Sequence, residues 1–411
     1  MRAEIIAVGS ELLSLERPET DSLFISSKLK TIGIEVLRKF VVGDREQELT
    51  EALSLALKHS DVVTITGGLG PTNDDMTREV VALFLGRELR EDQKILDDLQ
   101  RRYERFGLKL TPNNRRQAMV PDGAEVLPNP HGTAPGLFLK VADGLLFLLP
   151  GPPRELCPMV EKCVLPIIRR YKQVQPVPFR QLKVGGEAES RVDAKVESIY
   201  KEYQDVETTI LSSPGVISLY FNWKGDPDLE AADQVLDELS DRVKKRLGRS
   251  VFSNREEELA EAVGRLLKDR SLTVATAESC TGGLIGKLLT DVAGSSAYYL
   301  GSIVSYSNSV KEKVLGVPRT LLETDGAVSE SVARLMAIEV SGKLGSDVGL
   351  SVTGIAGPGG GTEEKPVGTI WLGLSIHDRT KTRSLFLPGR REAVRLRTSN
   401  LALDWLRREI L

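Results

Sequence analysis

The chain has 411 residues, of which 41 % are hydrophobic and 27 % charged, and its formal net charge is −3. These values are typical of a soluble globular protein of two or three domains, and they provide no basic field for binding nucleic acid or an acidic membrane. No apolar run reaches the roughly 20 residues of a membrane-spanning helix, and the first residues lack the pattern of a signal peptide. Three cysteines and three histidines indicate a reduced, cytoplasmic protein without a zinc cluster.

Residues 1–172 are predicted to form the first domain, in which strands and helices alternate. Strands that are apolar on both faces favour a parallel sheet with helices on both sides, which is a three-layer α/β/α fold. A long Pro/Gly loop at 115–136 is expected to serve function. The expected strands cover 4–8, 35–42, 61–66, 137–141 and 145–149, and the expected helices cover 21–29, 46–59 and 76–85.

A glycine-rich turn, residues 67–75 (GGLGPTNDD), follows the third predicted strand and precedes a helix. Such a turn lets the backbone approach a ligand, and a helix N-terminus favours phosphate, although the turn is neither a dinucleotide fingerprint nor a P-loop. Adjacent carboxylates would repel a phosphate unless a cation lies between the carboxylates and the phosphate. We therefore expect Asp74 and Asp75, together with Glu11, to hold Mg²⁺ or a similar hard cation. A helix cap with favourable dipole charge is the alternative interpretation of these carboxylates.

Four motifs occur in order in this segment: GSELL at 9–13, TGGLGPTNDD at 66–75, HGTAPG at 131–136 and LPGPPREL at 149–156. Together they resemble the molybdopterin-binding-like domain of the CinA (competence/damage-inducible) family. The resemblance implies a fold similar to molybdenum-cofactor biosynthesis proteins of the MoaB/MogA type. It also implies a nucleotide pocket, and in some members the pyrophosphate of ADP-ribose is cleaved with a divalent metal (Mg, Mn or Co) and K⁺. The residues that the resemblance places in this pocket are Gly67, Gly68, Gly70, Thr72, Asp74 and Asp75.

The chain departs from the family pattern just after GSELL. It lacks the next glycine and has Asp21 where the family has Asn, which adds negative charge near the expected pocket. A second interpretation of this half is therefore kept. In it, the domain is a non-catalytic module that binds a pterin, a nucleotide or a partner protein linked to competence.

Residues 173–250 are predicted to form a small α+β domain after a Pro-containing link at 173–178. This domain resembles the KH-like segment that joins the two halves of CinA proteins, and we expect it to act as a spacer. Its Val184-Gly185-Gly186-Glu187 turn carries an acid where an RNA-binding loop would be basic, so no RNA binding is predicted. The expected strands cover 179–184, 208–211 and 216–223, and the expected helices cover 188–203 and 228–247.

Residues 251–411 are predicted to form the third domain, a second three-layer α/β/α fold. Ser253 and Glu256 are expected to form a capping box at the start of its first helix. The strand at 272–277 leads into Glu278-Ser279-Cys280-Thr281-Gly282-Gly283 and then into a helix. A nucleophile on such a turn has backbone N–H groups beside it that favour an oxyanion. The alternative interpretation of Ser279 is a simple helix cap.

A catalytic serine needs a base, and no histidine is placed to serve. Lys311 follows the predicted strand at 301–307, and burial lowers the pKa of an amine enough to make it a base. Tyr306, five residues earlier, is a candidate to relay or steady the proton. A surface lysine and a core tyrosine are the alternatives for these two residues.

Seven motifs in this half resemble the nicotinamide-nucleotide amidase (NMN deamidase) family: AESCTGG, AGSSAYY, YSN-x-x-K, GAVSE, TGIAGP-x-GG, EEKPVGT and PGRR. The resemblance implies hydrolysis of nicotinamide mononucleotide (NMN) to nicotinate mononucleotide and ammonia without a cofactor. It implies that Ser279 is the nucleophile, that Lys311 and Tyr306 activate it, that Thr353 lies at the reaction centre and that Arg391 orients substrate or catalyst. Cys280 is the competing nucleophile. A homodimer is expected. The residues implied to bind substrate are Cys280, Thr281, Gly282, Gly283, Gly354 and Gly357.

Overall fold

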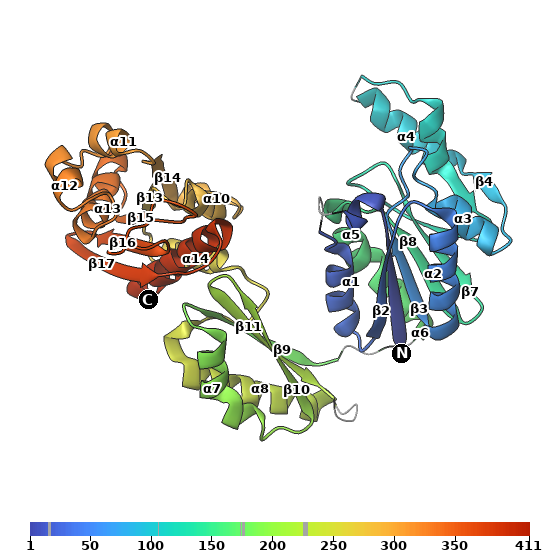
Figure 1. The fold of residues 1–411 in the computed structure, drawn as a ribbon. Helices are drawn as coiled ribbons and strands as arrows, with labels where there is room; N and C mark the ends of the chain where they lie inside the picture. Colours follow the sequence, from blue (N-terminus) through green and yellow to red (C-terminus); the bar gives the residue numbers. More distant parts are fainter. Residues whose placement is uncertain (15–17, 106, 173, 175–176, 225–228) are drawn as a thin grey trace. The chain divides into compact units, whose positions relative to one another are not determined.

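The computed structural model describes residues 1–411 except 15–17, 106, 173, 175–176 and 225–228. The chain is an α/β protein, as predicted, and forms two compact units, Met1–Val177 and Pro178–Leu411 (Figure 1). Within the described ranges no helix is both long and apolar enough to cross a bilayer.

The first unit contains a six-stranded sheet in the order β2-β1-β3-β8-β7-β6. Strands β2, β1, β3 and β8 are parallel, whereas β7 pairs antiparallel with both of its neighbours, β8 and β6. The sheet is therefore mixed, because a short turn rather than a helix joins β7 to β8. Its strands are β1 (Arg2–Val8), β2 (Glu35–Val42), β3 (Val62–Thr66), β6 (Glu125–Leu127), β7 (Gly136–Val141) and β8 (Gly144–Leu149).

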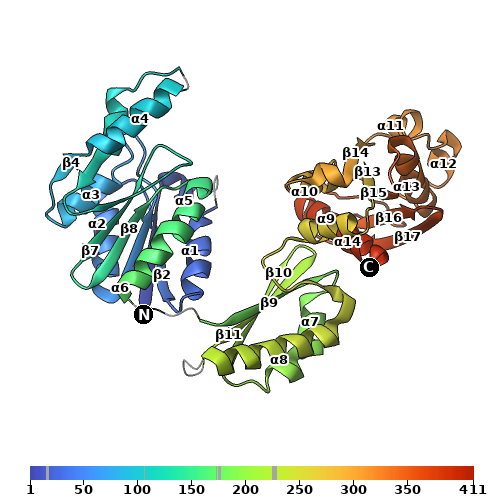
Figure 2. The same ribbon diagram turned by 180° about the vertical axis from the view of Figure 1, so that it is seen from behind.

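Helices cover both faces of this sheet, as the apolar strands predicted (Figures 1 and 2). On one face Ile25 and Leu156 belong to the buried cluster, and on the other face Leu53 and Val81 do. The helices are α1 (Asp21–Lys30), α5 (Pro153–Met159) and α6 (Leu165–Lys172) on the first face, with α2 (Glu46–His59) and α3 (Thr77–Phe84) on the second.

The segment predicted as a loop at 115–136 is partly regular. A 3₁₀ helix at Pro112–Ala118 leads into β5 (Met119–Pro121), which pairs with β4 (Leu89–Glu91), and β6 follows. Helix α4 (Gln93–Arg105), which lies between these two strands in the chain, packs against this segment with Ile95 and Leu99 buried. The sequence of α4 is strongly polar and has only a narrow apolar stripe, so apolar periodicity does not predict this helix.

The second unit contains a small antiparallel sheet in the order β10-β11-β9-β12, with two helices packed on one face. Its strands are β9 (Phe179–Gly185), β10 (Val206–Ser213), β11 (Val216–Trp223) and β12 (Val251–Ser253), and its helices are α7 (Glu189–Tyr200) and α8 (Leu229–Leu247). The link expected at 173–178 lies partly outside the described residues.

The larger sheet of the second unit has the order β14-β13-β15-β16-β17, with only β14, β13 and β15 parallel. Helices α9, α10 and α14 pack on one face, and α12 and α13 pack on the other. The strands are β13 (Val274–Glu278), β14 (Tyr299–Val304), β15 (Val348–Gly354), β16 (Thr369–Ile376) and β17 (Arg379–Phe386). The helices are α9 (Leu259–Asp269), α10 (Leu284–Thr290), α11 (Asn308–Lys313), α12 (Arg319–Thr324), α13 (Glu330–Leu344) and α14 (Arg391–Ile410).

Several contacts join the small sheet to the segment that carries the larger one. Strand β12, predicted as part of the third domain, pairs with β9. Arg408 of α14 donates to the Gly185 carbonyl oxygen at 2.5 Å, and Asp404 lies against the same glycine. The predicted separation of residues 173–250 from 251–411 as independent domains stays a prediction.

The capping box predicted from Ser253 and Glu256 is wrong. Helix α9 begins later, and Glu258 is its N-cap, with Glu261 completing the box. Ser253 ends β12 instead. A carboxylate can accept hydrogen bonds from the first amides of a helix, as a hydroxyl can. This stretch contains several acidic residues, so the sequence alone did not identify which of them caps the helix.

Candidate functional site

Ser279 and Lys311 meet at the carboxyl end of the larger sheet of the second unit. Ser279 follows directly after β13, and Lys311 follows β14, as predicted, in the short helix α11, which was not predicted. The Lys311 Nζ donates to the Ser279 Oγ at 3.0 Å and to the Ser305 carbonyl oxygen at 2.8 Å. The two side chains are within direct proton-transfer distance.

Burial shifts the pKa values of the Lys311 amine, which contacts the Ser279 hydroxyl, and of the Cys280 thiol, which belongs to the next residue. Lys311 is only 1 % exposed, and loss of water lowers the pKa of its amine to about 8. Cys280 is also buried, and burial raises the pKa of its thiol to about 12. At neutral pH a usable fraction of Lys311 is uncharged, whereas Cys280 stays a thiol. The local electrostatics favour serine chemistry at this turn.

The turn after β13 depends on glycine. Gly282 and Gly283 have φ of +61° and +89°, which side chains with a Cβ rarely adopt. The Ser279 amide donates to the Val352 carbonyl oxygen on β15, and the Gly282 amide donates to the Ser279 carbonyl oxygen. These contacts fix the backbone around the hydroxyl, which is 7 % exposed.

Glu278 is a functional candidate that sequence reasoning passed over. It is fully buried, and its two carboxylate oxygens accept from the amides of Ile285 and Gly286 at 3.1 and 2.8 Å. It therefore caps α10, so these helix amides are not available to a ligand. The only signal in the sequence was an acid at the end of an apolar strand.

Arginines from α14 contact the loops around Ser279. Arg391 donates to the Gly357 carbonyl oxygen at 2.7 Å and to the Tyr306 hydroxyl at 3.0 Å. Arg395, which no motif indicated, donates twice to the Thr281 carbonyl oxygen at 3.2 and 2.7 Å. The first residues of α14 therefore hold both the Ser279 turn and the glycine-rich loop after β15.

The Tyr306 side chain does not reach the Ser279–Lys311 pair as a proton relay would. It is 60 % exposed, and its hydroxyl is bound by Arg391 rather than by Lys311. Its backbone carbonyl oxygen accepts from the Lys311 Nζ at 3.4 Å. Tyr306 therefore contacts the base through its main chain.

Thr353 and Gly354 lie at the end of β15, beside β13. The Thr353 hydroxyl donates to the Ala327 carbonyl oxygen at 2.7 Å and is buried, which ties the GAVSE segment to the sheet. A Cβ on Gly354 would lie 2.3 Å from the Ile370 Cδ1. In this arrangement both residues support the site.

A separate, acidic pocket of about 470 Å³ lies in the first unit, where the glycine-rich turn meets the LPGPPREL motif. Among the described residues that line it there is no lysine or arginine. The lining carboxylates are Glu11, Glu19, Asp21, Asp44, Asp74, Asp75 and Glu155, and the predicted Gly67, Gly68, Gly70 and Thr72 also line it.

Glycine is required at the base of this pocket. A Cβ on Gly67 would lie 2.2 Å from the Val8 carbonyl oxygen, and one on Gly68 would lie 2.2 Å from the Thr77 Oγ1. Arg78, which is buried, donates to the Leu69 carbonyl oxygen, and Arg116 donates to the Thr72 and Asp75 carbonyl oxygens. The two arginines hold the turn from outside the pocket.

The carboxylates fit a hard cation in type but do not by themselves enclose one. Within the described part of the chain no three acidic, histidine or cysteine side chains are grouped closely enough to hold a metal. The Asp75 Oδ2 instead accepts from the Thr72 amide and hydroxyl at 2.8 and 2.6 Å. Mg²⁺ is often held by one or two carboxylates plus substrate phosphates and water. A metal at Asp74, Asp75 and Glu11 stays a proposal on that basis.

The chain was compared with known families and proteins. A model of the CinA C-terminal domain matches residues 256–410, and one of a probable molybdopterin binding domain matches residues 4–170. A putative competence-damage inducible protein of Thermoanaerobacter pseudethanolicus is 40 % identical over 411 residues, which cover 100 % of this chain and 99 % of the relative. A CinA-like protein of Dictyoglomus thermophilum is 41 % identical over 411 residues and 100 % of both chains. The crystal structure of a competence/damage inducible protein from Agrobacterium tumefaciens is 40 % identical over 36 % of this chain and 91 % of its own, with a TM-score of 0.35.

The fold and the two sites define a two-part α/β protein in which an acidic, glycine-lined pocket is combined with a buried serine–lysine pair. The chain belongs to the CinA family of competence-damage inducible proteins, with a molybdopterin-binding-like first half and a CinA C-terminal domain. A homodimer and a cytoplasmic location stay predictions.

Proposed function

We propose that the second unit hydrolyses the carboxamide of NMN to nicotinate mononucleotide and ammonia. The observation that carries this proposal is the 3.0 Å contact between the Ser279 Oγ and the Lys311 Nζ in a buried setting. The resemblance of the surrounding motifs to nicotinamide-nucleotide amidases supplies the substrate.

The proposed reaction is an acyl transfer through Ser279. Uncharged Lys311 accepts the hydroxyl proton as the Ser279 Oγ attacks the carboxamide carbon. The Lys311 ammonium then gives the proton to the nitrogen of the tetrahedral adduct, the C–N bond breaks, and ammonia departs to leave an ester between the acyl group and Ser279. Uncharged Lys311 next takes a proton from water as the water oxygen attacks the ester carbon. The Lys311 ammonium returns that proton to the Ser279 Oγ as the ester C–O bond breaks, which releases nicotinate mononucleotide and free Ser279.

Backbone amides of the Ser279 turn are the proposed oxyanion donors. Those of Gly282, Ile285 and Gly286 are already bonded within the protein. In the described chain the amides of Cys280, Thr281 and Gly283 donate to no backbone carbonyl oxygen, and those of Cys280 and Thr281 contact the Cys280 sulfur. One such donor contributes roughly 2.7–4 kcal/mol to transition-state stabilisation.

The test is a pair of alanine variants at neighbouring positions, assayed for ammonia release from NMN. Ser279→Ala is expected to lower kcat by roughly 10³-fold or more, whereas Cys280→Ala keeps kcat within about tenfold, with unchanged thermal unfolding for both. Near-native turnover by Ser279→Ala together with loss of activity in Cys280→Ala would overturn the assignment.

We further propose that the acidic pocket of the first unit binds a nucleotide pyrophosphate and cleaves ADP-ribose with a divalent metal. The glycine turn held by Arg78 and Arg116 and the carboxylate-rich lining support this proposal. A bound divalent metal would neutralise charge on the phosphates, and Asp74, Asp75 and Glu11 are its proposed ligands. A binding module without catalysis is the alternative.

Calorimetry and product analysis with ADP-ribose separate these two functions of the first unit. Binding that requires Mg²⁺, Mn²⁺ or Co²⁺, with AMP released, supports pyrophosphatase activity, and Asp74→Asn is expected to weaken binding at least tenfold. Binding without AMP release under any of these metals, with or without K⁺, leaves the binding module as the function. Ser279→Ala is the matched control, because its change lies in the second unit.

A further inference from the structure

The small sheet of the second unit has an open edge at β10. Among the described strands, β10 has a neighbour, β11, on one side only. Its eight residues (VETTILSS) contain one charged side chain and neither lysine nor proline, and its register with β11 has no bulge. Native proteins usually protect a strand edge with lysine, proline, a bulge or a short strand. The edge of β10 has none of these protections.

The backbone groups of three residues point outward along this edge. The turn between β10 and β11 has two residues, so Ser213 and Val216 flank it and form a hydrogen-bonded pair. The pairing alternates from there, which turns the amide and carbonyl groups of Thr208, Ile210 and Ser212 away from β11. In the described chain these three residues make no backbone hydrogen bond outside the strand ladder. The edge can therefore pair with another strand.

A groove of about 600 Å³ lies beside this edge, between β10 and helix α7. On the β10 side, the Thr208 Oγ1 is buried and has no hydrogen-bond partner within the described ranges. The residues that line the groove are Thr208 and Ile210 of β10 and Glu189, Ser190, Asp193 and Tyr200 of α7. A strand added to β10 would therefore lie against α7, with alternate side chains in the groove.

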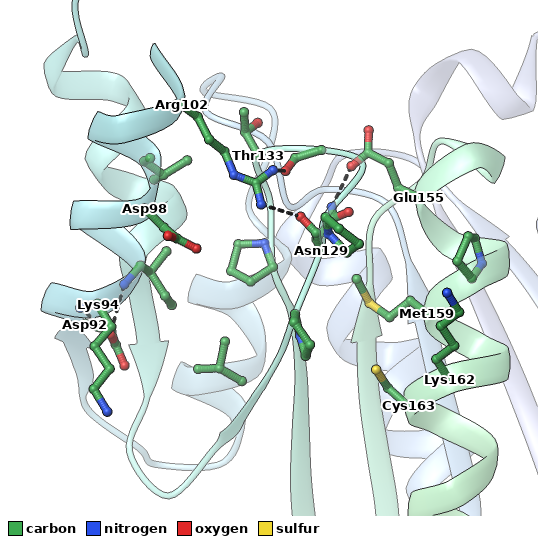
Figure 3. Close-up of a pocket in the computed structure, with 18 residues that line it drawn as sticks. Asp92, Lys94, Asp98, Arg102, Asn129, Thr133, Glu155, Met159, Lys162 and Cys163 are labelled. Carbon is green, nitrogen blue, oxygen red and sulfur yellow. Dashed lines mark hydrogen bonds between the residues drawn. The ribbon is translucent and has the colours of Figure 1, made fainter. Parts of the chain in front are cut away.

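The groove is acidic. No lysine or arginine is among the described residues that line it, and the ion pairs of α7 involve carboxylates other than Glu189 and Asp193. Elsewhere the chain itself provides a partner for a carboxylate that lines a hollow. Figure 3 shows this for Glu155 of the first unit, which accepts from the Asn129 Nδ2 at 2.8 Å. The free carboxylates beside β10 match a basic ligand.

A second copy of this chain matches the edge less well. Two β10 strands joined edge to edge would bring the acidic sides of two α7 helices together, and like charges repel. Strand β17 is a basic edge strand of the larger sheet, but its groups are already engaged. Arg334 donates to the Thr380 carbonyl oxygen at 3.1 Å, and Lys381 is paired with Glu409. A basic segment of another protein is the better match.

We propose that β10 binds an extended, basic segment of another protein, which adds to the small sheet as a fifth, antiparallel strand. Backbone hydrogen bonds to Thr208, Ile210 and Ser212 provide affinity, as in other complexes formed by strand addition. Every second side chain of the added strand faces α7, where lysine or arginine meets Glu189 and Asp193. The small sheet is thus a docking module, independent of both activities proposed above.

Three labelled heptapeptides test the proposal on the full chain by fluorescence anisotropy. The probe, acetyl-Thr-Lys-Val-Lys-Thr-Lys-Val-amide, has lysine at every second position. One control has glutamate in place of lysine. The other has N-methyl groups on the lysine amides, which are the amides that face β10 when the lysine side chains face α7. We expect the probe to bind at least roughly tenfold more tightly than either control, with affinity that falls as salt is added.

Each control peptide can contradict one part of the proposal. Equal binding of the glutamate peptide overturns the basic partner, and equal binding of the N-methylated peptide overturns strand addition. Absence of binding by the lysine peptide overturns the docking site as a whole.

Variants of the full chain place the binding at this edge. Proline is tolerated on an edge strand where the missing amide faces outward, so Thr208→Pro is expected to weaken binding of the lysine peptide at least roughly tenfold with unchanged thermal unfolding. Asp193→Asn is expected to weaken it at least about threefold. The matched control is Asp241→Asn on α8, which is exposed and does not line the groove, and it keeps affinity within about twofold.

Two further outcomes would decide against the proposal. Unchanged binding in both Thr208→Pro and Asp193→Asn overturns β10 as the site. A homodimer that dissociates in Thr208→Pro places a second copy at the edge and overturns the basic partner. If Thr208→Pro does not fold, the N-methylated peptide decides.

Discussion

The Lys311 Nζ lies 3.0 Å from the Ser279 Oγ although the two residues are 32 positions apart in the chain. The contact arises because β13 and β14 are parallel neighbours, and the segments that follow them leave the same edge of the sheet. A buried amine beside a hydroxyl is a base only when it is uncharged. The activity proposed for this unit therefore depends on how far burial lowers the pKa of Lys311.

The pH dependence of turnover tests the role of Lys311. Because its pKa is about 8 in the folded protein, the uncharged fraction rises with pH through that value. We expect kcat/KM for NMN to increase about tenfold per pH unit below pH 8 and to level off above it. A profile that is flat between pH 6 and 9 would remove Lys311 from the base role.

Lys311→Met is expected to abolish turnover while making the protein more stable. The folded-state pKa of about 8 is below the usual 10.5, so the unfolded chain binds more protons between these values. The free energy of unfolding therefore rises from pH 8 to 10.5, and the cost of burying the charge is fully present below pH 8. Each pKa unit corresponds to about 1.4 kcal/mol, so we expect a gain of roughly 1–3 kcal/mol at pH 7. Urea denaturation measures it, and a loss of stability contradicts the burial argument.

Glu278→Gln should disturb the Ser279 turn without touching the reacting atoms. The neutral amide has one acceptor oxygen, so one of the amides of Ile285 and Gly286 loses its partner, at a cost of about 1–3 kcal/mol. We expect lower thermal stability and a kcat reduced by about tenfold or more, with the pH profile unshifted. Glu261→Gln, at the start of α9, is the control for a lost cap far from Ser279, and an equal fall in kcat there would contradict a positioning role for Glu278.

Tyr306→Phe separates a proton relay from a contact with Arg391. The hydroxyl is bonded to Arg391 and not to the serine–lysine pair, and the carbonyl that accepts from Lys311 is kept in the variant. We expect kcat/KM to fall less than about tenfold, with the pKa of its pH profile unchanged. A kcat loss as large as that of Ser279→Ala would restore the relay.

Gly132→Ala is expected to destabilise the first unit and to weaken its nucleotide binding. The added Cβ would lie 1.8 Å from the buried Glu155 Oε2, so the loop or the helix that carries Glu155 has to move, at a cost of about 1–3 kcal/mol or more. Thermal unfolding and ADP-ribose calorimetry measure both effects. Gly359→Ala is the control, because a Cβ there meets nothing within 4 Å.

Much of the fold could be predicted from periodicity because the central strands of its large sheets are buried. Strands β1, β2, β3, β7 and β8 coincide closely with the predicted ranges. The antiparallel strands on one side of each large sheet could not be predicted, since apolar runs carry no information on direction. Helix α4 could not be predicted from apolar periodicity because only Ile95 and Leu99 of its thirteen residues are buried.

In the candidate site, likewise, residues that belong to one motif could be predicted, whereas residues that are joined only by tertiary contacts could not. Ser279 and its glycines stand in one short run, so the turn could be predicted locally. Arg395 and Glu278 could not be assigned, because their partners are a carbonyl oxygen 114 residues away and amides in the next helix. The position of Lys311 was predicted, but its helix was not, since α11 has only six residues.

Helix α14 contacts both the loops around Ser279 and the small sheet of the second unit. Arg391 and Arg395 near its start hold the loops around Ser279, and Arg408 near its end holds Gly185 of the small sheet. Its twenty residues form a rod about 30 Å long, too stiff to bend at low cost. A displacement of the small sheet would therefore tilt the helix and change the alignment of the loops around Ser279. The small sheet would thereby affect the activity proposed for this unit without contacting Ser279.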